Sequence, residues 1–199
     1  MSDIIYTYHD TVYFNITNRC NCNCIFCIRK ETDSVGDAGT LWHDHNPSFE
    51  EIKTAVDAFD FSGHAEAVFC GYGEPTCAYD NLIQTARYMK EKYPQIHLRI
   101  NTNGLGERFN EAPIVEEMAS CIDSVSISLN APDAQRYQEV TCPSYENAFS
   151  IMLDFARKAK EHFSSVQFSV VDIITEDEIK ACKELADSMG IPLRVRVCS

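Results

Sequence analysis

Three cysteines near the start of the chain have the type and spacing needed for iron–sulfur chemistry. Cys20, Cys24 and Cys27 lie in the run RCNCNCIFC, residues 19–27, with the spacing C-x3-C-x2-C. A four-iron cluster normally takes four cysteine ligands. Three thiolates in this arrangement would bind three irons of a 4Fe–4S cluster and leave the fourth iron open to a substrate. Cys22 is redundant in this pattern, and we expect it to point away from the cluster.

The same cysteines permit two other interpretations. A structural zinc site closes with four nitrogen or sulfur ligands, and Cys24 and Cys27 could supply half of one. The segment WHDH, residues 42–45, could supply the other half. The protein would then be a zinc-stabilised binding module that regulates a partner metal-dependent hydrolase. Disulfides or inert thiols are the third possibility, because the chain contains ten cysteines.

The N-terminal sequence argues against disulfides. Residues 1–4 show neither the basic region nor the long apolar run of a secretory signal peptide. We therefore expect a cytoplasmic protein. Reduced cysteines in that compartment more often bind metals or take part in catalysis than form bridges.

The composition indicates one globular domain over residues 1–199. The chain is 45% apolar, which is ordinary for a domain of this size. No segment approaches the ~20 apolar residues of a membrane span, so we expect no membrane association. The formal net charge of −13 repels nucleic acid and anionic membrane surfaces, so nucleic acid is not an expected partner.

Six predicted strands alternate with helical segments along the chain. The strands are rich in β-branched and aromatic residues and lie at 11–16, 65–70, 97–100, 124–129, 166–173 and 193–197. The helices are expected at 49–59, 80–92, 113–119, from 131–133 onward, at 147–161 and at 176–189. This alternation predicts an α/β fold with a parallel sheet and right-handed crossovers.

Local sequence signals mark two of the helix starts and one helix end. Ser48 and Glu51 have the spacing of a capping box, and Thr175 and Glu178 repeat it before the last helix. Gly190 is typical of the residue that follows a helix C-terminus.

Polar or glycine-bearing segments follow the first four predicted strands, at residues 20–27, 71–76, 101–104 and 130. Loops at the carboxyl ends of parallel strands build the active sites of (βα) barrels. An open Rossmann sheet would instead concentrate function at one switch point. The spread of motifs therefore favours a partial barrel.

Taken alone, three of these motifs have simple structural interpretations. In GYGEPT, residues 71–76, Thr76 stands where a dinucleotide fingerprint needs its third glycine, which leaves a turn. The segment NTNG, residues 101–104, could be an Asn-Gly turn. Alternation along SISLN places Ser126, Ser128 and Asn130 on one face, which predicts a polar cavity and not a packed core.

Two pairs of residues are further candidates for ligand contacts. Arg194 and Arg196 alternate on the last strand and share a face, where they would bind a substrate anion if inward and be solvated if outward. His43 and His45 are candidates for a substrate or second-metal contact, although most loop histidines are simply solvated.

The remaining cysteines give weaker signals. Cys70 and Cys77 flank the Gly-Glu-Pro segment and could donate a hydrogen atom, although a buried cysteine is usually a small hydrophobe. The others show no tight spacing, so we expect no second cluster; they are Cys121, Cys142, Cys182 and Cys198.

The motifs together resemble those of radical S-adenosylmethionine (SAM) enzymes. Phe26 precedes the last cysteine of the motif, as in that family, and GYGEP is similar to its Gly-Gly-Glu-Pro element with Tyr72 in place of the first glycine. The resemblance implies a 4Fe–4S cluster on the three cysteines and SAM chelated by the open iron. It also implies a six-stranded (βα)6 partial TIM-like barrel that covers nearly the whole chain.

The resemblance further implies which residues contact SAM. The Gly-Glu-Pro element, residues 73–75, would meet the SAM ammonium group through Gly73, Glu74 and Pro75. Thr102 and Asn103 would lie near the methionyl group. The other implied contacts are Ser128 and Asn130 with the ribose hydroxyls or carboxylate and the Phe26 backbone with the adenine.

The resemblance implies a function but no substrate. The reduced cluster would cleave SAM to methionine and a 5'-deoxyadenosyl radical, which abstracts hydrogen from an unidentified substrate. An external electron donor, flavodoxin- or ferredoxin-like, is expected. Residues 17–20, 26–29, 69–76 and 126–133 are most similar to small TatD-associated radical SAM proteins, which implies a possible TatD-type hydrolase as partner.

Overall fold

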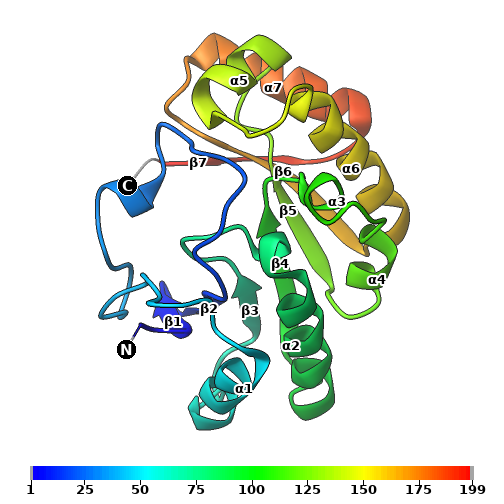
Figure 1. The fold of residues 1–199 in the computed structure, drawn as a ribbon. Helices are drawn as coiled ribbons and strands as arrows, with labels where there is room; N and C mark the ends of the chain where they lie inside the picture. The colour runs from blue at the N-terminus through cyan, green and yellow to red at the C-terminus, as the bar shows by residue number, and fades with distance from the viewer. Residues whose placement is uncertain (1, 198–199) are drawn as a thin grey trace.

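The computed structural model describes residues 2–197, and its central feature is one curved sheet (Figure 1). The sheet has seven strands in chain order. The first strand runs antiparallel to the second, and every later pair is parallel. The strands are β1 (Ile5–Tyr8), β2 (Thr11–Phe14), β3 (Glu66–Phe69), β4 (His97–Thr102), β5 (Ser124–Ser128), β6 (Ser165–Val171) and β7 (Leu193–Arg196).

The expectation of six strands is corrected by β1, which the sequence analysis missed. The six predicted strands correspond to β2–β7, and β1 pairs with β2 as a hairpin in which Tyr8 faces Thr11. The two loop residues, His9 and Asp10, have φ values of 47° and 61°. Two-residue hairpin loops of this kind favour Asn-Gly or Asp-Gly, so His-Asp gives little signal in the sequence.

The helices follow the strands along one side of the sheet (Figure 1). Both predicted capping boxes are present, at Ser48 and Thr175, and Gly190 ends the last helix with φ of 62°. The helix predicted at 113–119 begins two residues later, and α3 was not predicted. The helices are α1 (Phe49–Ala58), α2 (Tyr79–Lys92), α3 (Gly106–Asn110), α4 (Val115–Ala119), α5 (Ala134–Thr141), α6 (Ala148–His162) and α7 (Glu176–Met189), with 3-10 turns η1 (Ile28–Lys30) and η2 (Pro75–Ala78).

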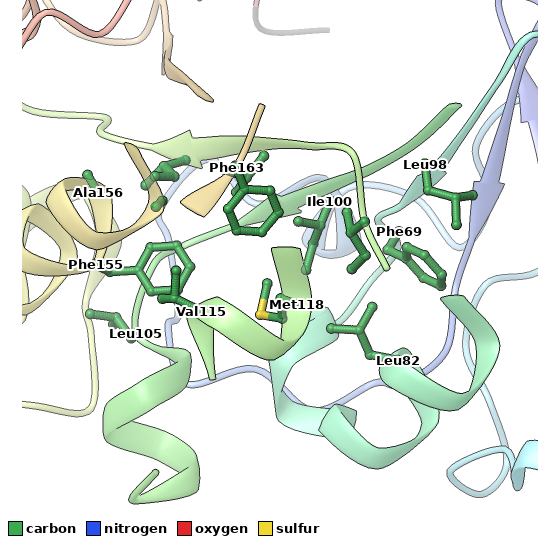
Figure 2. Close-up of a cluster of buried hydrophobic side chains, with 14 of the residues drawn as sticks. Phe69, Leu82, Leu98, Ile100, Leu105, Val115, Met118, Phe155, Ala156 and Phe163 are labelled. Carbon is green, nitrogen blue, oxygen red and sulfur yellow. The ribbon is translucent and has the colours of Figure 1, made fainter. Parts of the chain in front are cut away.

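The face of the sheet toward the helices is apolar. Phe14, Phe69, Ile100 and Val125 form one row across four strands, and each is at most 1% exposed. Figure 2 shows Phe69, Leu98 and Ile100 of the sheet beside side chains of the helices. Burial of this face supplies the main driving force for folding.

The opposite face of the same strands is polar. Arg99, Ser124 and Ser165 are neighbours in one row, and Ser128, Ser169 and Arg194 are neighbours in another. A polar face can persist inside a curved sheet only where it meets water, ligand or its own hydrogen-bond partners. This inner face is therefore the surface on which a site can form. Among residues 2–197, no helix has the length and apolar character needed to cross a membrane.

Candidate functional site

The three cysteines lie in the loop that follows β2, here called the cysteine loop (residues 15–27). Cys20 is exposed, whereas Cys24 and Cys27 are partly buried, and none of the described cysteines forms a disulfide. The loop is held against the end of α5, because Asn23 N donates to Thr141 O at 3.1 Å and Ile25 N donates to Val140 O at 3.0 Å. Three free thiols are thus presented on an anchored backbone.

The thiols fit the donor set of a cluster better than that of a single ion. Within residues 2–197, no group of three or more His, Cys, Asp or Glu side chains could hold one metal ion. Cluster ligands bind separate irons, so they need not converge on one point. A hydrogen bond from the Cys22 thiol lowers the pKa of Cys24, which favours the thiolate form that binds metal, whereas burial raises the pKa of Cys20 to about 12.

The histidine half of the zinc interpretation is engaged elsewhere. His43 is 8% exposed, and its ring bonds Asn15 O at 2.8 Å and Ser2 Oγ at 2.6 Å. His45 bonds Glu51 at 2.8 Å on the surface. Burial lowers the pKa of His43, and the two hydrogen bonds make this ring a structural link between the N-terminal segment and the residue after β2.

Gly73 contacts the backbone of the cysteine loop directly. A Cβ at this position would lie 2.2 Å from Thr17 O and 2.7 Å from Arg19 O, closer than any real side chain comes. The next residue, Glu74, donates its N–H to Arg19 O at 2.8 Å. The glycine is therefore required for the loops after β2 and β3 to meet, a role that the sequence analysis did not anticipate.

The Glu74 carboxylate joins the loops after β3 and β4. Its Oε1 accepts from the hydroxyls of Thr102 at 2.7 Å and Thr76 at 2.8 Å, and its Oε2 accepts from Asn103 N at 2.8 Å. The side chain is 5% exposed. Burial raises the pKa of the Glu74 carboxyl, and hydrogen bonds from Asn103, Thr102 and Thr76 oppose that shift.

Asn103 closes the network back onto the cysteine loop. Its Nδ2 donates to Asn21 Oδ1 at 2.5 Å and reaches Cys22 Sγ at 3.5 Å. Cys22 is buried, and the Asn103 amide lies against its thiol. The cysteine loop, residues 71–76 and residues 102–104 thus form one hydrogen-bonded unit, which we call the loop frame.

Ser128 and Asn130 lie where β5 ends, and Asn130 is unusual in two ways. Its φ of 55° is left-handed, and its side chain is 4% exposed. Its Oδ1 is buried and has no hydrogen-bond partner among the described residues. An unpaired buried acceptor is unfavourable, so this atom fits a ligand that brings a donor, such as a hydroxyl. The site therefore fits a cofactor of the expected chemistry.

The other predicted contacts occupy different surroundings. Phe26 is partly buried against the main hydrophobic core. Pro75 is buried and begins η2, for which Glu74 is the N-cap. Cys77 is buried, lies beside the frame and lines a cavity of about 340 Å³ with Arg19 and Phe109, outside the predicted SAM residues. Cys198 lies outside the described residues.

Two polar residues that matter for the frame were missed by the sequence analysis. Asn15 is 0% exposed, accepts from Tyr72 N at 3.1 Å and donates to Leu41 O at 2.7 Å. Asn21 is 4% exposed and receives the Asn103 amide. A signal in the sequence exists only for Asn15, which directly follows the buried Phe14 of β2, a position where a polar side chain usually requires hydrogen-bond partners.

The protein therefore has an α/β fold in which the cysteine loop, residues 71–76 and residues 102–104 meet at the carboxyl ends of parallel strands. The family model described as "Radical SAM superfamily" matches residues 14–186. The chain belongs to the radical SAM superfamily, and that membership implies a 4Fe–4S cluster and SAM.

Relatives with different names share this region. The GTP 3',8-cyclase of Lactiplantibacillus plantarum is 28% identical over 82% of this chain and 46% of its own length. The FeMo cofactor biosynthesis protein NifB of Chlorobaculum tepidum is 26% identical over 65% of the chain and 30% of its own length. The chain spans about half the length of the cyclases it matches.

A solved structure shows the same fold at lower identity. A radical SAM methyltransferase from Sphaerobacter thermophilus superimposes with a TM-score of 0.67 and 15% identity, covering 97% of this chain and 68% of that one. The sheet is thus similar to those of radical SAM partial barrels.

Proposed function

We propose that this protein is a radical SAM enzyme acting on a substrate that its motifs do not identify. One observation carries the proposal: Cys20, Cys24 and Cys27 are free thiols on a loop that the Glu74 network fastens to the Gly-Glu-Pro and Thr-Asn-Gly segments. When bound, the reduced cluster supplies the electron that cleaves SAM to methionine and a 5'-deoxyadenosyl radical, which abstracts hydrogen from the substrate.

The residues of the frame would hold SAM in two ways. Backbone carbonyls near Gly73 and Pro75 and the remaining acceptor capacity of Glu74 Oε2 suit an ammonium group, which only donates. The Thr102 hydroxyl already bonds Glu74, so its proposed role is to orient that carboxylate. The proposed role of Asn103 is also indirect, because its amide holds the cysteine loop through a hydrogen bond to Asn21.

The residues at the end of β5 would contact the sugar or carboxylate of SAM. Asn130 Oδ1 is a buried acceptor with no partner among residues 2–197, and Ser128 precedes it on the inner face. A ribose hydroxyl that donates to Asn130 would remove an unfavourable feature of the structure. The Phe26 backbone remains our proposed neighbour of the adenine.

The proposal extends to architecture and partners. Six parallel strands, β2–β7, support a (βα)6 partial TIM-like barrel, and we treat residues 1–199 as one core domain. An external flavodoxin- or ferredoxin-like donor would supply the electron. A cytoplasmic location agrees with the free thiols of the described cysteines.

A TatD-type hydrolase is the proposed macromolecular partner. Its support is the resemblance of residues 17–20, 26–29, 69–76 and 126–133 to TatD-associated proteins. Size-exclusion chromatography of the mixture is expected to show co-elution. Separate elution at all concentrations would remove the partner from the proposal.

The decisive experiment is anaerobic iron–sulfur reconstitution followed by EPR of the dithionite-reduced protein with and without SAM. A 4Fe–4S signal that changes on SAM addition, with production of 5'-deoxyadenosine, is expected. Cys24→Ala should lose both, whereas Cys142→Ala, at an exposed cysteine outside the loop, should keep both. Production of 5'-deoxyadenosine by Cys24→Ala at the wild-type rate would refute the proposal.

A further inference from the structure

The inner face of the sheet carries positive charge that its own residues do not neutralise. Arg99 is paired, because its guanidinium meets Glu66 through two bonds of 3.0 Å and Asn101 through one of 2.7 Å. Neither Arg194 nor Arg196 forms an ion pair with another residue of the described range 2–197. The whole chain has a formal net charge of −13, so two guanidinium groups on one face make that face a local region of positive charge.

The strand register puts both arginines on the inner face. Arg194 faces Ser169 across the β6–β7 pair, and Ser169 in turn faces Ser128. Arg196 stands two residues farther along β7, toward the carboxyl ends of the strands. Valines at 195 and 197 take the opposite side of β7 and are exposed; on the inner side Arg194 is exposed and Arg196 is half-buried.

Electrostatic effects on neighbouring strands agree with this orientation. Burial raises the pKa of Tyr13 on β2, and the positive charge of Arg194 opposes a small part of that increase. Burial also raises the pKa of the Cys70 thiol after β3, and the positive charge of Arg196 opposes part of that increase. Both guanidinium groups therefore act across the inner face on residues several strands away.

A cavity adjoins this charge. It has a volume of about 290 Å³, and its lining includes Arg194 but not Arg196, together with Gln167, the Arg99–Glu66 pair and residues at the amino ends of the strands such as Ser165. The Nε of Arg196 is buried and has no hydrogen-bond partner within the described part of the chain. Guanidinium groups bind carboxylates and phosphates in two-point geometry, and neighbouring hydroxyl or amide groups add single hydrogen bonds.

We propose that Arg194 and Arg196 form a subsite on the inner face that binds an anionic group of the substrate, a carboxylate or a phosphate ester. That the anion belongs to the substrate rests on the proposed function, whereas binding of an anion rests on the strand register of both arginines, the cavity that Arg194 lines and the buried Nε of Arg196. Arg194 shares a row with Ser128 and lies two strands away, roughly 10 Å at ~4.8 Å per strand. A small substrate could span that distance to the SAM end of the site.

The test measures binding of two probes, inorganic phosphate and acetate, to the reconstituted protein by calorimetry at low ionic strength, where screening is weak. Arg194→Gln/Arg196→Gln is the test variant. Arg87→Gln/Arg157→Gln is the matched control, because it removes the same charge from exposed helix positions paired with Glu117 and Asp154.

We expect the wild type and the control to bind at least one probe and the test variant to bind it at least about tenfold more weakly. Tighter binding of phosphate would assign a phosphate ester, and tighter binding of acetate a carboxylate. No saturable binding to the wild type, or equal binding to all three proteins, would overturn the proposal and leave the arginines as charges that protect an edge strand.

A second readout separates this inference from the proposed function. The test variant should retain the SAM-dependent EPR change and uncoupled 5'-deoxyadenosine formation, because its arginines contact the substrate. Loss of the SAM response would assign the arginines to SAM and overturn the subsite. Anion binding by a wild-type protein that assembles no cluster would uphold the subsite and refute the enzyme function.

Discussion

Two parts of the inner face, the loop frame after β2–β4 and the residues of β5–β7, differ in how fully their buried polar groups find hydrogen-bond partners within the protein. In the loop frame, after β2–β4, both oxygens of Glu74 receive hydrogen bonds, from Thr102, Thr76 and Asn103, although the Nδ2 of Asn21 is buried with no partner among the described residues. In the half formed by β5–β7, Asn130 Oδ1 and Arg196 Nε are buried with no partner among the described residues. The difference indicates that the Glu74 network is a preformed support for the cysteine loop, whereas the Asn130 and Arg196 atoms are open to a ligand.

If the frame is a support, removing its central carboxylate should have the largest effect on stability. Glu74→Ala leaves several buried donors unpaired, since the Asn103 N–H and the Thr102 hydroxyl lose their acceptor. Because each such donor is costly, we expect a loss of about 3 kcal/mol in the free energy of unfolding. Urea denaturation of the anaerobic apoprotein would measure it.

Glu117→Ala is the control for this variant. Glu117 also accepts two side-chain hydrogen bonds, from Tyr79 and Arg87, but on the surface. Its removal should change the free energy of unfolding by at most about 1 kcal/mol. Equal losses in both variants would mean that the Glu74 network does not support the frame.

The close contact at Gly73 predicts the next largest effect. Gly73→Ala places a Cβ 2.2 Å from the Thr17 carbonyl, and backbone cannot withdraw as a flexible side chain can. We expect about 2 kcal/mol of destabilisation and a lower yield of reconstituted cluster. Gly39→Ala, where the nearest atom lies 3.5 Å away, should stay within about 0.5 kcal/mol of the wild type. A wild-type cluster yield in Gly73→Ala would contradict the close approach of the two loops.

The buried state of Glu74 also predicts a pH dependence. Because burial raises the pKa of this carboxyl from its ordinary 4.5, the folded protein binds the proton more tightly than the unfolded chain. That contribution to stability is fully present below pH 4.5 and is lost as pH rises through the folded pKa. The difference in free energy of unfolding between the wild type and Glu74→Gln should therefore shift against the wild type as pH rises from 4.5. A difference that does not change with pH would contradict the raised pKa.

The strands and helix caps depend on local sequence pattern and could be predicted. The strands β2–β7 are rich in β-branched and aromatic residues, and the capping boxes at Ser48 and Thr175 involve residues three positions apart, so both were found. The strand β1 was missed, because its turn, His9-Asp10, lacks the glycine that usually marks such hairpins.

The network of the frame could not be predicted from local pattern. Glu74 and Thr102 are 28 positions apart, and Asn103 and Asn21 are 82 apart. A motif shows that a polar residue is present, but only the packing of β3 against β4 decides which donors reach it. The same limit applied to Arg194 and Arg196, whose inward direction depends on the β6–β7 register.

The smallest effect on stability is expected in the other half, at Asn130, where the comparison is sharpest. Asn130→Gly removes an acceptor that no described residue uses and keeps a backbone that tolerates the φ of 55°. The free energy of unfolding should change by no more than about 1 kcal/mol. SAM affinity of the reconstituted protein should fall about tenfold, the effect of one lost hydrogen bond in a buried site. Gly73→Ala should show the reverse balance, with stability lost first. If Asn130→Gly instead destabilised the protein by as much as Glu74→Ala and left SAM affinity unchanged, the two halves would both be structural, and the ligand would have to bind elsewhere.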